Sequence, residues 1–115
     1  MIAVYAQMLL IILACSTSSS DTSLICDEAQ EVEWDYWADG FFRTYCKGCH
    51  SSTSDNRFGA PERINFDSQD DVIYHADLIY NSVIINQNMP KGGGVEEVEL
   101  QFLETYLRCW GNLKP

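Results

Sequence analysis

Cys46, Cys49 and His50 are the residues whose types and spacing point most directly to chemistry, in the order Cys-Lys-Gly-Cys-His. Two thiols three positions apart lie on neighbouring faces of one helical turn, so both can bond to one flat ligand. An imidazole directly after the second thiol can bind a metal at the centre of that ligand. The C-x-x-C-H spacing is that of covalent haem attachment. It predicts thioether bonds from Cys46 and Cys49 and an iron bond from His50.

Two other kinds of site use paired cysteines. A thioredoxin-like redox pair is found near a strand-helix-strand pattern, and no such pattern surrounds Cys46. A structural zinc site needs four ligands, and the sequence holds no second C-x-x-C and no H-x-x-x-H to supply the other two. The sequence therefore favours haem over both alternatives.

The start of the chain has a different composition. Residues 1–14 carry no charged side chain and are almost wholly apolar, but they are too few to span a bilayer. An apolar run that ends in Ile-Leu-Ala-Cys is typical of an export signal and resembles the lipobox of bacterial lipoproteins, in which the cysteine is lipidated. The alternative is a buried helix of the fold, since no Lys or Arg precedes the run. We expect an export signal at 1–14, a lipid on Cys15, a Ser-rich tether over 15–25, and an exported, periplasmic, membrane-anchored protein.

The folded domain is expected over residues 26–115. About 90 residues form a marginal apolar core, and a large buried cofactor would add to it. Cys26 and Cys109 remain once the other cysteines are assigned, and export to an oxidising compartment favours a disulfide between them; two unpaired buried thiols are the alternative. The net charge of −10 argues against nucleic acid as a partner and favours a redox partner with a basic docking patch.

Apolar residues recur at helical spacing in three segments and alternate at period two in none. The pattern predicts helices over 33–47, from Asp67 or Ser68 to about Val83, and over 96–110. Polar and glycine-rich stretches between them predict long loops. We therefore expect an all-α domain with three main helices and long loops wrapped around one covalently bound haem.

From Glu33 to Leu107 the chain resembles the class I, single-haem cytochromes c. The shared marks are the C-x-x-C-H motif, Pro61 eleven positions after His50, Met89 followed by Pro90, and two sets of helix-crossing residues: Ala38 and Phe42 facing Leu103, Tyr106 and Leu107. The resemblance implies a cytochrome c-like fold. It also implies that the Pro61 carbonyl accepts a hydrogen bond from His50 and that Met89 binds the iron opposite His50. The segments Arg-Phe-Gly-Ala-Pro and Phe-Asp and the late Cys109 further resemble small exported bacterial cytochromes.

Other residues are candidates for the same site. His75 is an alternative to Met89 as the second iron ligand, but it falls toward the polar side of its helix. Phe58, Phe66 and Tyr80 can line the haem or belong to ordinary core packing. Arg57 can pair with a haem propionate or lie solvated at the surface. Pro90 is expected beside the haem through its neighbour Met89.

The resemblance implies a one-electron carrier rather than an enzyme. Iron held by both His50 and Met89 has no open position for a small-molecule substrate. The alternatives are a haem-based gas sensor in which Met89 dissociates, with Gly92, Gly93 and Gly94 permitting the movement, or a haem-bearing subunit of a respiratory complex.

Overall fold

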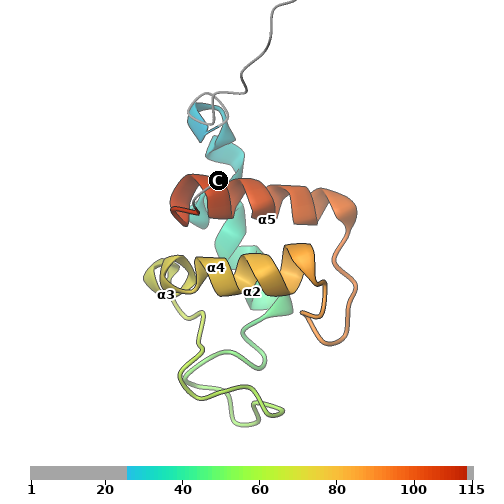
Figure 1. Cartoon of the computed structure of the whole chain (residues 1–115). Coiled ribbons are helices and arrows are strands. Elements are labelled where there is room, and N and C mark those ends of the chain that lie inside the picture. The colour runs from blue at the N-terminus through green and yellow to red at the C-terminus, as the bar shows by residue number, and fades with distance from the viewer. Residues whose placement is uncertain (1–25, 114–115) are drawn as a thin grey trace, which may run out of the picture.

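The structure is a computed structural model, and it describes residues 26–113 (Figure 1). All regular structure within this range is helical, with no strand, which confirms the all-α prediction. The predicted export signal at 1–14 and the lipidated tether at 15–25 lie outside the described residues. The elements follow in the order η1 (Ala29–Val32), η2 (Trp34–Ala38), α2 (Asp39–Tyr45), α3 (Gln69–Tyr74), α4 (Ala76–Ile79), η3 (Tyr80–Ile85) and α5 (Glu97–Trp110).

The first predicted helix is present as η2 followed directly by α2. Its apolar residues recur at helical spacing, and Ala38 and Phe42 are fully buried. Gly40 lies on the exposed side, where no atom would contact an added side chain. The short η1 before it contributes Val32 to the core, an element that the sequence pattern did not reveal.

The second predicted helix is divided into α3, α4 and η3. Ser68 begins it with a reciprocal cap, because its side chain accepts from the Asp71 N–H while the Asp71 carboxylate accepts from the Ser68 N–H. The helical hydrogen bonding shifts at His75 and again at Tyr80, where the last turn widens. Its buried residues recur at helical spacing, as the sequence predicts: Val72, Ala76, Ile79 and Val83. Tyr80, beside this stripe, is half-buried.

The third predicted helix is α5, which crosses the first helix in Figure 1. Leu103, Tyr106 and Leu107 are fully buried along its inner face. The Tyr106 ring meets the Phe42 ring edge-on, with centroids 6.5 Å apart. Gly111 ends α5 so close to α4 that an added Cβ would lie 2.7 Å from the Ala76 Cβ. Two of the expected contact positions of the crossing helices, Phe42 and Tyr106, therefore do meet.

A disulfide joins Cys26 to Cys109, with an S–S distance of 2.05 Å. It links the first described residue to the last turn of α5 across a sequence separation of 83 residues. The predicted pairing is confirmed. Closing a loop of this length stabilises the fold by about 4 kcal/mol in the chain-entropy model.

The remaining chain forms two long loops, 46–68 and 86–96, at the side of the helices away from α5 and at its N-terminal end (Figure 1). No helix within residues 26–113 combines the length and the apolar character needed to cross a bilayer.

Candidate functional site

Two adjoining cavities of about 230 Å³ and 470 Å³ lie between the helices and these loops. The smaller, here the helix-side cavity, is mainly apolar, and the larger, the loop-side cavity, is bordered by exposed loop residues. Six residues line both: Tyr45, Cys46, His50, Pro61, Met89 and Pro90. The helix-side cavity is completed by Ile64, Phe66, Leu78, Ile79, Ser82 and Val83, and the loop-side cavity by Cys49, Arg57, Phe58, Gly59, Ala60, Lys91 and Gly92. The residues of the C-x-x-C-H motif and Met89 thus lie at one place.

The Cys46–His50 segment is a single turn that continues from α2. The Cys46 N–H donates to Phe42 O at 2.9 Å, and the His50 N–H donates to Cys46 O at 2.9 Å. Cys46 and Cys49 are not joined to each other. Both cysteines line the loop-side cavity, as expected for two residues that bind one ligand.

Burial raises the pKa of the Cys46 thiol to about 12, and the neighbouring Cys49 adds to the shift. The reactive form of cysteine in thiol-disulfide exchange is the thiolate, and redox-active C-x-x-C pairs have lowered pKa values. A thiol that stays protonated in an apolar wall is poorly suited to that chemistry. This observation weighs against the thioredoxin-like alternative.

His50 lines both cavities, and one nitrogen of its imidazole is engaged by the protein. Nδ1 donates to the Ile64 carbonyl at 3.0 Å, so the proton is assigned to Nδ1 and the lone pair to Nε2. The ring packs on Phe66 with centroids 5.1 Å apart, and the His50 carbonyl accepts from the Phe66 N–H at 2.8 Å. His50 is therefore held in the tautomer that a metal ligand needs.

The expectation for the Pro61 carbonyl is wrong. That oxygen accepts from the Ile64 N–H at 3.0 Å and from Arg57 Nη2 at 2.6 Å, whereas His50 bonds to Ile64. The hydrogen bond from the Ile64 N–H to the Pro61 carbonyl closes a turn over 61–64. The Ile64 carbonyl, rather than that of Pro61, is then the acceptor for the His50 imidazole. Pro61 still contributes its side chain to both cavities.

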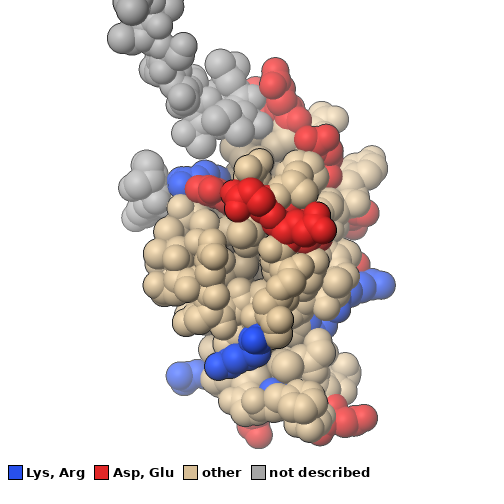
Figure 2. Space-filling view, turned by 90° about the vertical axis from the view of Figure 1, so that its right-hand side faces the viewer, with Lys and Arg blue, Asp and Glu red and all other residues tan. Residues whose placement is uncertain are grey.

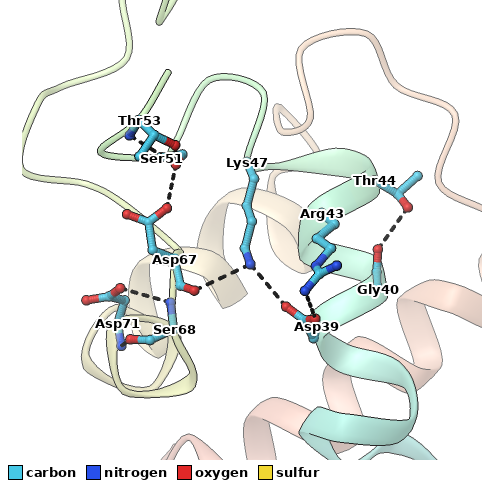
Figure 3. A network of polar contacts seen from close by, with 10 residues as sticks. All are labelled: Asp39, Gly40, Arg43, Thr44, Lys47, Ser51, Thr53, Asp67, Ser68 and Asp71. Carbon is cyan, nitrogen blue, oxygen red and sulfur yellow. Dashed lines mark hydrogen bonds and ion pairs between the residues drawn. The ribbon is translucent and has the colours of Figure 1, made fainter. Parts of the chain in front are cut away.

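Lys47, inside the motif, connects the turn to Asp39 of α2 and to the loop residue Asp67 (Figure 3). Its ammonium pairs with the Asp39 carboxylate at 3.0 Å and donates to the Asp67 carbonyl at 3.4 Å. It also lies 5.8 Å from the ring centroid of Trp34. One side chain thereby connects the motif with α2 and with the loop that leads to α3.

Asp67 holds the loop that follows His50 (Figure 3). Its carboxylate accepts from the Ser51 hydroxyl at 2.5 Å and from the Ser52 N–H at 2.9 Å. The hydrogen bond from Ser51 is the main reason that the pKa of Asp67 is lowered. Because Ser51 directly follows His50, this carboxylate fixes the backbone from which the His50 side chain extends.

Met89 is positioned by the end of η3. The Ser82 carbonyl accepts from the Asn88 N–H at 3.0 Å and from the Met89 N–H at 3.2 Å, which turns the chain back toward the cavities. Met89 lines both cavities, together with Cys46 and His50 of the motif. The alternative ligand, His75, lines neither cavity and packs edge-on against Phe66 with centroids 6.0 Å apart.

Tyr45 ties α2 to the start of α5 beside the cavities. Its hydroxyl donates to Glu99 Oε2 at 2.7 Å, and the same oxygen accepts from the Glu96 N–H at 3.1 Å. The bond to Glu99 raises the pKa of Tyr45. The phenol ring forms part of both cavity walls while its polar end is satisfied elsewhere.

Arg57 borders the loop-side cavity, but its guanidinium is directed into the loop. Every N–H group has a protein acceptor: Ala60 O, Ser51 O, Asn65 Oδ1, Pro61 O and Ile64 O. The two expectations for Arg57, a propionate partner and a solvated surface residue, both give way to a residue that organises the loop.

The aromatic candidates separate into three positions. Phe66 is buried in the helix-side wall, whereas Phe58 is 77% exposed at the rim of the loop-side cavity. Tyr80 lines neither cavity, which corrects the expectation for it. Its hydroxyl donates to Glu104 at 3.3 Å and accepts from Arg108 at 3.0 Å, because Tyr80 turns toward α5. Pro90 lines both cavities beside Met89, as expected.

Several lining residues are absent from the sequence-based set. Tyr45, Ile79 and Val83 belong to the predicted apolar stripes, so the helical periodicity offered a signal for them. Ile64, Leu78 and Ser82 had none, since their roles depend on the path of the loops.

Within residues 26–113 no group of three or more His, Cys, Asp or Glu side chains is placed to hold a metal ion by itself. No family model, curated protein or solved structure matches the chain.

Proposed function

We propose that this protein is a c-type cytochrome with a single haem, which carries one electron at a time between redox partners outside the cytoplasm. The observation that carries the proposal is the shared cavity wall formed by Cys46, His50 and Met89, with Cys49 beside it. The two cysteines supply the thiols, His50 the imidazole and Met89 the thioether sulfur that such a site requires.

The residues present fit a haem in type, order and surroundings. Cys46 and Cys49 would hold it covalently, and His50 Nε2 and the Met89 sulfur would bind its iron. The helix-side wall is apolar, which suits a flat hydrophobic ring. Cys46 is half-buried in this wall, and the loss of water around its thiol raises its pKa. Thioether formation would remove that titrating group.

Bound haem would supply the one-electron chemistry between ferric and ferrous iron. The chain's own residues define how that chemistry is used. Met89 is a soft, weak donor that favours the reduced state and so raises the potential. With His50 and Met89 both engaged, no position remains for a substrate, so we propose a carrier and not an enzyme.

A cytochrome c-like fold belongs to the same proposal. It is supported by a helix that leads directly into the motif, long loops on the cavity side and an α5 that crosses the first helix (Figure 1). The contact of Phe42 with Tyr106 supports it at the crossing itself.

The partner is proposed to be a redox protein with a basic patch. The net charge is −10, and acidic side chains form a band over the upper part of the face in Figure 2, while most of the Lys and Arg side chains on this face lie lower. Exposed acidic residues include Glu28, Glu31, Asp35, Glu96 and Glu97. Association with such a partner is expected to slow as salt rises. Tethering through a lipid on Cys15 would keep the carrier at a membrane surface.

Carbon monoxide binding to the reduced protein tests the carrier function. Because Met89 is proposed to occupy the iron, the wild-type protein is expected to show no spectral change with the gas. The variant Met89→Ala is expected to take it up readily and to have a lower midpoint potential. His75→Ala is the matched control, since His75 lines neither cavity, and it is expected to behave as the wild type.

Rapid uptake of the gas by the wild-type protein would favour the sensor over the carrier. A Met89→Ala variant with an unchanged potential would contradict Met89 as the ligand. Stable co-purification of the wild-type protein with a membrane oxidase would favour a subunit of a respiratory complex.

A further inference from the structure

The Ile64 carbonyl oxygen accepts two hydrogen bonds. One comes from His50 Nδ1 at 3.0 Å and the other from Arg57 Nη2 at 3.0 Å. A carbonyl oxygen has two lone pairs, so both are used. Among the described residues, the His50 imidazole therefore shares the acceptor of its Nδ1 proton with a permanent positive charge.

The Arg57 guanidinium cannot leave this position without breaking several bonds. It donates to Pro61 O at 2.6 Å, Asn65 Oδ1 at 2.7 Å, Ser51 O at 2.5 Å and Ala60 O at 3.2 Å. These acceptors come from both ends of the 51–65 loop, so the loop closes around a planar group that only arginine provides.

The charge of Arg57 is also not neutralised nearby. Its acceptors are carbonyl and amide oxygens, and none of the ion pairs within residues 26–113 includes it. The side chain is half-buried, which reduces screening by water and salt. A fixed cation thus lies one carbonyl away from the His50 ring.

Arg57 acts on His50 in two ways, through its hydrogen bond to the Ile64 carbonyl and through its charge, and both act in the same direction. A carbonyl that accepts from the imidazole N–H makes the opposite nitrogen a stronger donor. A cation bonded to that same oxygen draws away electron density, so it weakens this effect, and its charge disfavours additional positive charge at the site. A weaker imidazole donor and a nearby cation both favour the lower oxidation state of a bound metal.

We propose that Arg57 is a positioning residue that sets the strength of the His50 ligand through the shared Ile64 carbonyl and thereby raises the midpoint potential. This inference rests on the proposed function, because it concerns a haem iron bound by His50. It gives Arg57 a role distinct from pairing with a propionate, since none of its N–H groups is left for one.

Potentiometric titration of haem-loaded Arg57→Gln tests the inference. At a fixed electrode potential the ratio of reduced to oxidised protein is expected to fall by about tenfold, the size of the smaller losses in metal affinity or activity that follow mutation of the hydrogen-bond partners of metal ligands. For a one-electron couple this corresponds to about 59 mV. The NMR signal of the His50 Nδ1 proton is expected to shift as its acceptor loses a competing donor. A merely structural role would instead displace the Ile64 carbonyl from His50, and the Nδ1 proton signal would be lost to exchange with water rather than shifted, which would overturn the inference.

Arg63→Gln is the matched control, because Arg63 is an exposed cation of the same loop with no hydrogen bond or ion pair to residues 26–113. Its potential is expected to equal that of the wild type. An equal fall in both variants would overturn the inference and indicate an effect of net charge. A wild-type potential in Arg57→Gln would overturn it as well.

Arg57→Lys decides the matter if Arg57→Gln fails to fold. Lysine keeps the charge but not the planar guanidinium. We expect a potential between those of the wild type and the neutral variant, with a shifted signal of the His50 Nδ1 proton. A potential and a proton signal identical to those of the wild type would overturn the inference. Wild-type protein that carries no haem would contradict the proposed function itself. Loaded variants with equal potentials would contradict only the role of Arg57.

Discussion

The helical half and the loop half of this molecule are held together by different forces. The helical half, 26–45 with 97–111, is closed by a disulfide and filled by aromatic and aliphatic side chains, among which Phe42, Leu103 and Tyr106 are fully buried. The loop half, 51–68 with 86–96, contributes Phe66 as its one buried hydrophobic residue. Its shape depends on single polar groups such as Arg57 and Asp67.

Stability and the geometry of the site therefore depend on different parts of the molecule. Apolar packing in the helical half is redundant, because each buried ring has several neighbours. In the loop half, one carboxylate and one guanidinium fix the segment that carries the acceptor for His50. Changes in the helical half away from Tyr45 should therefore alter the unfolding free energy with little effect on the site, and changes in the loop half should alter both.

Removing the disulfide should have the largest effect on stability. The double variant Cys26→Ser and Cys109→Ser is expected to lose about 4 kcal/mol of unfolding free energy, because the unfolded chain regains the entropy of a long open loop. Guanidinium unfolding monitored by circular dichroism measures the change. Neither cysteine lines a cavity, so the visible spectrum should stay that of the wild type. An altered spectrum would show that the two halves are not separable.

The variant Asp67→Asn should have an intermediate effect, of about 1–2 kcal/mol at neutral pH, because two hydrogen bonds lose their charged acceptor. The pKa of Asp67 is lowered in the folded protein, so its contribution is present above the ordinary value of 3.8 and is lost as pH falls through the lowered value. The difference between wild type and variant should therefore shrink in acid.

Chemical unfolding across this pH range measures the effect of Asp67. Asp55→Asn is the control, since Asp55 is an exposed loop carboxylate without a hydrogen bond or ion pair to residues 26–113. A pH-independent difference for Asp67→Asn would indicate that the charge of the carboxylate is not what holds Ser51.

Two glycines give the smallest and most direct comparison of the halves. Gly40→Ala in α2 is expected to stabilise the protein by about 0.5–1 kcal/mol, because the helical position has open space around it. Gly93→Ala in the loop half is expected to destabilise it by about 1 kcal/mol, because φ is +67° there. Thermal unfolding of both variants measures the pair. Shifts of the same sign would contradict the distinction.

The helices and the motif were predictable from sequence, and the loop contacts were not. Periodicity predicted the helices close to their observed bounds, since the apolar spacing directly reflects which face is buried. The cavity walls contain Cys46, His50 and Met89 as expected. The Ile64 carbonyl and the bonds of Arg57 had no signal, because backbone oxygens carry no residue identity and a loop has no period. Tyr80 was misassigned because it neighbours Ile79 in the stripe yet turns toward α5.

Intact mass together with a visible spectrum shows whether the protein carries a covalent haem. The protein is purified from an export-competent host that attaches haem, alongside the double variant Cys46→Ala and Cys49→Ala. The wild type is predicted to be coloured and heavier than its polypeptide by one haem, and the variant to lack any such covalent addition. A colourless wild-type protein with the mass of the bare polypeptide would contradict haem attachment and every redox role proposed for it.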